Sequence, residues 1–237
     1  MRGLYYNIKY RKERSKIMRI FRGFTLAETL IALGVIGVVA AIVIPSLGRV
    51  KPNEEMAMLR KAYYLTSRTV NELINDEDFY PDTDNPNTSG FSNTNPEHVA
   101  RYHGRDYQGP GKFCGLFAAR LNTRGAVNCD AATSFSYRQA PEGNFETADG
   151  IVWSVPVGNF ASGTAPTGDG SNIAQEIVVD VNGRKRPNCF PGNRNCNNPD
   201  RYRMSVDRWG KIYVPDSTRV MLTASDMTKT YAQLTRN

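Results

Sequence analysis

The stretch "RIFRGFTLAETLIALGVIGVVAAIVIPSL" (residues 19–47) decides how this chain is read. Residues 29–48 are twenty consecutive positions without a charge, enough for about 30 Å of helix at ~1.5 Å per residue. That length matches the hydrocarbon core of a bilayer. One carboxylate, Glu28, lies directly before the run. A charge in an apolar helix is costly unless it has a partner, so the sequence predicts a specific partner for Glu28.

The formal net charge of +7 is concentrated at the N-terminus. Residues 1–23 contain eight basic residues and one acidic residue, a net +7, so the other 214 residues sum to zero. Basic residues on one side of an apolar segment indicate its orientation, with the basic side cytoplasmic and the remainder exported. The charge therefore indicates topology and not, by itself, a nucleic-acid ligand.

The chain contains four cysteines, all in the part that would be exported: Cys114, Cys129, Cys189 and Cys196. An even number in an exported domain favours disulfides over zinc or a thiol nucleophile. Three connectivities are possible. Sequence proximity favours Cys114–Cys129 and Cys189–Cys196, because short loops close most easily.

Residues 22–45, "RGFTLAETLIALGVIGVVAAIVIP", resemble the N-terminus of type IV pilins and of the pseudopilins of type II secretion. The resemblance implies cleavage by a prepilin peptidase after Gly23 and N-methylation of the new terminal residue, Phe24. It also implies an assembly role for Glu28, which would pair with the Phe24 amine of a neighbouring subunit. Assembly would then neutralise a carboxylate that the membrane-stored subunit leaves unpaired.

The family resemblance also implies an α+β fold, in which a long N-terminal helix packs on an antiparallel β-sheet head. Residues 1–23 would be a basic leader, although a start at Met18 would leave only "MRIFRG". Residues 24–48 would form the transmembrane and assembly helix, with a kink at Pro45. Residues 49–78 would continue the helix in amphipathic form, and residues 79–237 would form the disulfide-stapled head.

Periodicity in the residues themselves supports this plan. Apolar or small residues recur at three- and four-residue steps through the second helix, which predicts one buried stripe. Alternating and β-branched segments then predict strands, with "DRWG" (207–210) as a hairpin turn. The predicted stripe is Met56, Leu59, Tyr63, Thr66, Val70 and Leu73, and the predicted strands are 150–157, 175–181, 201–206 and 211–215.

No catalytic residues are predicted, so the chain is not expected to be an enzyme. The order Asp180, Asn182, Gly183 is similar to the opening of a calcium loop, to which Asp200 or Asp207 could add a ligand. No glutamate follows at the twelfth position, and an Asn-Gly turn is the alternative interpretation. Calcium is therefore a weak prediction, and no other cofactor is expected.

Basic residues also gather late in the chain. Residues 183–211 contain eight basic and two acidic residues, a net +6, with Tyr202 and Trp209 nearby. One interpretation is a DNA-contact patch. The alternative is a set of solvated strand faces, or salt bridges to the acidic run at residues 72–84.

Together these patterns predict a structural subunit that is anchored in the inner membrane, with its N-terminus cytoplasmic and its head periplasmic, before it polymerises. The filament would be a type IV pilus or a type II secretion pseudopilus. Its expected partners are other subunits, the prepilin peptidase, the inner-membrane assembly platform and membrane lipid. The alternatives are a minor or tip subunit that primes assembly or binds DNA, and a single-span anchored ectodomain that never polymerises.

Overall fold

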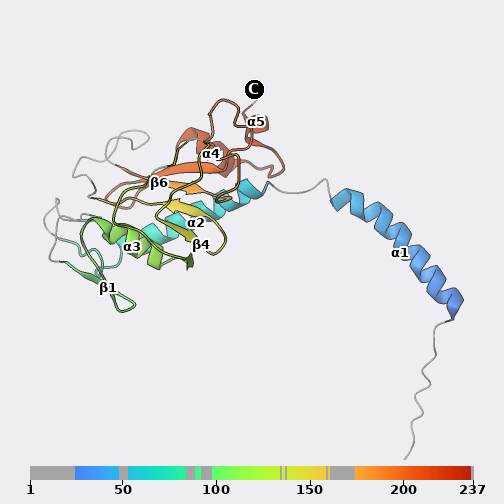
Figure 1. Ribbon diagram of the computed structural model, residues 1–237, viewed down its shortest axis with the longest axis horizontal. Helices are drawn as coiled ribbons and strands as arrows, with labels where there is room; N and C mark the ends of the chain where they lie inside the picture. The colour runs from blue at the N-terminus through green and yellow to red at the C-terminus, as the bar shows by residue number, and fades with distance from the viewer. Residues whose placement is uncertain are drawn as a thin grey trace, which may run out of the picture. The chain divides into compact units, whose positions relative to one another are not determined.

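A computed structural model describes residues 25–47, 53–83, 89–91, 98–133, 135–136, 138–158, 160 and 174–235, with the backbone alone for 43–47. The chain divides into two compact units, residues 1–50 and residues 51–237. Each unit is described by itself (Figure 1). The described part of the second unit, from residue 53 onward, is called the head.

Helix α1, Leu26–Leu47, is the secondary structure of the described part of the first unit. It runs on for two residues beyond Pro45 before it ends. Large apolar side chains on all sides of the helix are exposed, as they are at Leu30, Ile31 and Leu33. No helix in the described residues combines the length and apolar character required of a membrane span. Residues 48–52, where the predicted continuous helix would join α1 to the next one, lie outside the described residues.

Helix α2, Glu54–Ile74, opens the head. The Asn53 side chain caps its start by accepting a hydrogen bond from the backbone N–H of Met56 at 3.2 Å. Five of the six positions predicted for its buried stripe are buried, but Tyr63 is 36% exposed. Ala62 takes its place, because it lies three residues after Leu59 and four before Thr66 and so stays on the inward face.

Six strands form one antiparallel sheet in the order in which they occur along the chain. A separate two-stranded hairpin, β1 with β2, precedes it. The hairpin is β1 Ala100–Tyr102 and β2 Arg105–Tyr107, and the sheet is β3 Thr123–Arg124, β4 Phe145–Thr147, β5 Val152–Ser154, β6 Gln175–Asp180, β7 Arg201–Val206 and β8 Ile212–Tyr213.

The inner face of the sheet and α2 share one hydrophobic core. Of the four residues predicted to share one face of the 150–157 strand, Ile151, Trp153 and Val155 are buried in it, and Val157 is partly buried against it. The predicted hairpin at residues 207–210 is confirmed, because β7 pairs antiparallel with β8. An N-terminal helix followed by an antiparallel sheet is the α+β arrangement that the sequence predicts.

Four short helices complete the fold, and none of them was predicted: η1 Gly109–Gly111, α3 Lys112–Ala119, α4 Asp216–Thr223 and α5 Tyr231–Leu234. Helix α3 is largely buried, and its Phe117 ring lies 5.7 Å from the Trp153 ring, measured between centroids. Arg120, just after α3, donates to Glu72 at 3.4 Å and to Asp76 at 3.2 Å. These bonds join α3 to the end of α2.

The outer face of the sheet is also partly covered. Phe135, Val152 and Val178 form a second buried cluster, with Phe190 packed against it. The prediction that the outward residues of β7 are all solvated is therefore wrong for Arg201, which is fully buried.

Candidate assembly site

At the start of α1, Thr25 and Glu28 bond to one another in both directions. The backbone N–H of Glu28 donates to Thr25 Oγ1 at 3.2 Å. The Glu28 carboxylate in turn accepts from the Thr25 backbone N–H at 2.8 Å and from the Thr25 hydroxyl at 3.0 Å. This is a capping box, in which the residue before a helix and the third residue within it satisfy each other's backbone N–H groups.

The capping box gives Glu28 partners within its own chain, and the pairing of Glu28 with the amine of a neighbouring subunit stays a prediction. The Glu28 carboxylate has two hydrogen-bond donors, both from Thr25, although neither donor carries a charge. The pattern T-x-x-E before an apolar run is the sequence signature of this arrangement, so Thr25 could have been found from the sequence. The predicted cleavage and methylation residues, Gly23 and Phe24, lie outside the described residues.

Small residues are frequent along α1: Ala32, Gly34, Gly37, Ala40 and Ala41. A Cβ atom added at Gly34 or at Gly37 would have no described heavy atom within 4 Å outside its own local helix backbone. No described contact within the chain therefore requires glycine at either position. Small residues on an apolar helix allow a second helix to approach closely.

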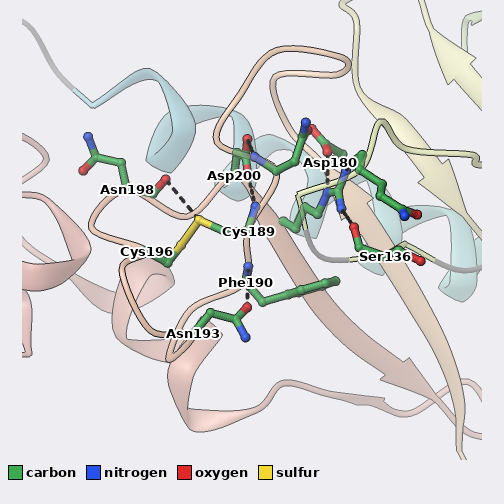
Figure 2. A network of polar contacts seen from close by, with 11 residues as sticks. Ser136, Asp180, Cys189, Phe190, Asn193, Cys196, Asn198 and Asp200 are labelled. Carbon is green, nitrogen blue, oxygen red and sulfur yellow. Dashed lines mark hydrogen bonds and ion pairs between the residues drawn. A yellow bond between two sulfur atoms is a disulfide. The ribbon is translucent and has the colours of Figure 1, made fainter.

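In the head, Arg201 is the centre of a buried polar network (Figure 2). Its Nε donates to Asp180 Oδ2 at 2.7 Å, and both side chains are fully buried. Its two terminal nitrogens donate to the backbone carbonyls of Ser136 and Gln139. Asp180 and Arg201 are cross-strand partners on β6 and β7. The guanidinium therefore holds Ser136 and Gln139 against the outer face of the sheet.

The same network holds the disulfide loop at residues 189–196. The Asp200 carboxylate accepts hydrogen bonds from the backbone N–H groups of Asn188 and Cys189, each at 2.8 Å. Within the loop, the backbone N–H of Phe190 donates to Asn193 Oδ1 at 3.0 Å (Figure 2). A carboxylate that accepts two backbone N–H groups fixes the direction in which the chain enters the loop.

Both disulfides that sequence proximity favours are present. Cys114 is bonded to Cys129, and Cys189 is bonded to Cys196. The first joins α3 to the segment before β4, and the second closes the loop between β6 and β7.

Burial raises the pKa of Asp180 to about 7, and the hydrogen bond from Arg201 opposes that shift. The negative charge of nearby Asp200 also raises it. The second oxygen of the carboxylate, Oδ1, is buried and has no hydrogen-bond partner in the described part of the chain. The charged form of the Asp180 carboxylate therefore has one oxygen, Oδ1, that neither a hydrogen bond from a described residue nor solvent stabilises.

Comparison with known proteins identifies the region that contains Thr25, Glu28 and most of α1. Residues 18–44 match the family model described as "Prokaryotic N-terminal methylation motif". The chain carries the prepilin-type motif of type IV pilins and pseudopilins. The prepilin motif covers Thr25, Glu28 and most of α1, and it does not extend into the head. No curated protein and no solved structure matches the chain.

The prepilin motif indicates a membrane-anchored or pilus-associated protein of the cell envelope. Its family is structural and not enzymatic. The motif also implies processing by a prepilin peptidase and assembly with other pilin subunits.

The calcium candidates Asp180 and Asp200 are bonded within the chain, to Arg201 and to two backbone N–H groups. Asn182 lies in the turn after β6, with its Oδ1 buried. The described residues contain no group of three or more His, Cys, Asp or Glu arranged to hold a metal ion. Calcium binding remains a prediction.

The basic residues at 183–211 do not form one surface. Arg201 and Arg208 are buried, and the Arg208 guanidinium donates to the Ser89 carbonyl at 2.7 Å. Arg203 pairs with Glu176 on β6. The predicted salt bridges to the acidic run are also wrong for its described residues, 72–83, where the ion pairs go to Arg68 and Arg120. The turn after β6 is left with three exposed cations, at residues 184–186.

Proposed function

We propose that this protein is a structural subunit that is cleaved after Gly23, methylated on the amine of Phe24, and polymerised through α1. The filament is a type IV pilus or a type II secretion pseudopilus. The observation that carries the proposal is the helix itself, most of which lies within the prepilin motif and which exposes apolar side chains on every side. A helix that is apolar all round is stable when it is buried on all sides, by lipid or by other helices.

Two further features support burial among copies of the same helix. Gly34 and Gly37 have space around them in one chain, which an adjacent helix would fill. Glu28 has only neutral donors in its own chain, so a cationic amine from a neighbour would offer it a stronger bond. The alternative is a single-span ectodomain that never polymerises. It would account for the apolar surface of α1 by burial in lipid, but it would give no role to Glu28, Gly34 or Gly37.

The test is Glu28→Gln in cells that contain the prepilin peptidase and the assembly platform. Glutamine can take the same place in a capping box, so the start of α1 is kept while the negative charge is lost. We expect normal amounts of processed subunit in membranes and a large loss from the sheared filament fraction. Leaving an amine unpaired in the filament core would cost about 3–5 kcal/mol by analogy with broken buried ion pairs.

The matched control is Glu142→Gln, an exposed glutamate of the head, which should assemble normally. Intact mass should show a mature chain that begins at Phe24 with one added methyl group for both variants. Normal incorporation of Glu28→Gln without wild-type subunits would remove the assembly role of Glu28. A chain that keeps its leader in the presence of the peptidase would leave the anchored-ectodomain alternative.

A further inference from the structure

Three cations form a basic turn at residues 184–186, directly after the turn that ends β6. Arg184, Lys185 and Arg186 are all exposed. None of them makes an ion pair with any residue that the structure describes. Three adjacent like charges repel one another, and nothing in the described part of the chain offsets that repulsion with a close carboxylate.

The basic turn borders a groove of about 680 Å³ beside the first turn of α2. Glu54, Glu55 and Met58 line the side formed by the helix. Among the other charged residues of the groove, Arg124 pairs with Glu146 at 3.9 Å and Asp149 pairs with Lys61 at 2.7 Å. Glu54 and Glu55 form no ion pair with a described residue. The groove therefore has unpaired carboxylates on the side formed by the helix and unpaired cations on the side formed by the basic turn.

An acidic segment at residues 77–82 lies at the other end of α2. Glu77, Asp78 and Asp82 are exposed and form no ion pair with a described residue. Three cations lie nearby, but each is already occupied: Arg120 pairs with Glu72 and Asp76, Lys112 packs over the Tyr80 ring at 4.4 Å, and Arg208 donates to the Ser89 carbonyl. The exposed charge of this segment is negative.

The two charged segments do not meet within one copy of the chain. The basic turn lies beside residues 54–58 and the acidic segment follows residue 74, so all 21 residues of α2 separate them. A helix of that length spans about 30 Å. Charges this far apart in solvent are screened almost completely at physiological ionic strength.

We propose that the basic turn of one copy binds the acidic segment of a second copy of this chain. The two surfaces differ, so the contact is head-to-tail and can repeat without closing into a dimer. The inference rests on the proposed filament function and deepens it. It names the head surfaces that come together while the α1 helices pack.

Cysteine crosslinking tests the contact in the full chain. One tagged copy carries Lys185→Cys and an untagged copy carries Asp82→Cys, and both are produced in the same cells and oxidised. We expect a mixed dimer in the filament fraction and in solubilised membranes. The matched control replaces Lys185→Cys by Arg105→Cys, an exposed arginine on β2, and should give no mixed dimer.

Charge exchange tests the chemistry of the contact. Lys185→Glu alone should lower the filament fraction by about tenfold, since it places like charges opposite one another. Asp82→Lys alone should do the same. The two substitutions together should restore the filament fraction to within about twofold of the wild-type chain, because the pair is then reversed and not lost. Both substituted side chains are exposed, so the melting temperature of the head should not change in any of the three variants.

The outcomes separate this contact from the proposed function. If wild-type filaments form but the mixed dimer is missing and the exchanged pair gives no recovery, the contact is wrong and the filament function stands. If wild-type chain never enters filaments, the proposed function fails, and the mixed dimer in membranes decides the contact alone. The presence of the mixed dimer in membranes supports the contact, and its absence from both the membrane and the filament fractions overturns the contact.

Discussion

In the head, Trp153, Arg201 and Tyr202 are fully buried, whereas in α1 the side chains of Leu33, Ile36 and Ile42 are 63–69% exposed. The buried groups of the head include charged ones, and each of these has partners within its own chain. The apolar side chains described in α1 have no comparable contacts with described residues. The head is therefore specified by contacts within one chain, whereas the contacts described for α1 do not account for its apolar surface.

The largest expected effect on stability comes from breaking the buried ion pair of the head. Arg201→Ala leaves the Asp180 carboxylate buried without its charged partner and removes two bonds to backbone carbonyls. We expect the free energy of unfolding to fall by about 3–5 kcal/mol. Urea unfolding of the full chain in detergent, followed by tryptophan fluorescence, would measure it.

Arg203→Ala is the matched control for this prediction. Arg203 lies two residues along the same strand and pairs with Glu176 at 3.4 Å, and both side chains are half exposed. Its loss should cost no more than about 1 kcal/mol. Equal losses for the two variants would show that the head does not depend on the buried network.

A change in pH is expected to have a smaller effect on the stability of the head. The pKa of Asp180 is raised to about 7 by burial, above its unfolded value of about 3.9. The folded head therefore binds more protons than the unfolded chain between these values, and its stability should fall as the pH rises through 7. The slope for one proton is at most about 1.4 kcal/mol per pH unit.

Urea midpoints at pH 5, 6, 7 and 8 would check this, with Asp180→Asn as the comparison. The variant keeps an acceptor for Arg201 but cannot ionise, so its profile should be flatter than that of the wild-type chain. A wild-type midpoint that rises across the same range would show that Arg201 outweighs burial at this carboxylate.

The smallest effect on stability is expected in α1. A side chain at Gly37 meets nothing within 4 Å in one chain, so Gly37→Leu should change the unfolding free energy of the head by less than about 0.5 kcal/mol. The filament fraction should nevertheless fall, because a larger side chain keeps a second helix away. A head substitution provides the contrast. Gly143→Ala would place its Cβ 2.4 Å from the Trp153 carbonyl oxygen and should destabilise the head. Normal assembly of Gly37→Leu would show that α1 does not pack closely there.

Much of the head was predictable where a pattern repeats over enough residues. Helix α2 and strands β6 and β7 contain several periods each, and both disulfides join cysteines that are close in sequence. Strands β3 and β4, of two and three residues, are too short to show a period. They exist because each pairs with a neighbour in the sheet.

The main errors concern charged residues whose partners are distant. Arg201 alternates with apolar residues on β7, and this pattern predicts a solvated side chain. In the structure the side chain is buried, and the two backbone carbonyls that accept its hydrogen bonds lie 62 and 65 positions away in the sequence. No local pattern indicates such a contact. The Thr25–Glu28 capping box is the opposite case, because its partners are three residues apart and its signature is short.

The capping box also bears on how a joint between subunits can open. The Glu28 carboxylate has two donors from Thr25, at 2.8 and 3.0 Å, that travel with it in the same turn of chain. If Glu28 pairs with the Phe24 amine of a neighbour, as we propose, a subunit that leaves this neighbour can exchange that bond for the two hydrogen bonds from Thr25, so that its carboxylate is not left without a donor. That exchange lowers the penalty for release relative to a carboxylate with no donors of its own. Thr25 thereby makes the joint easier to reverse.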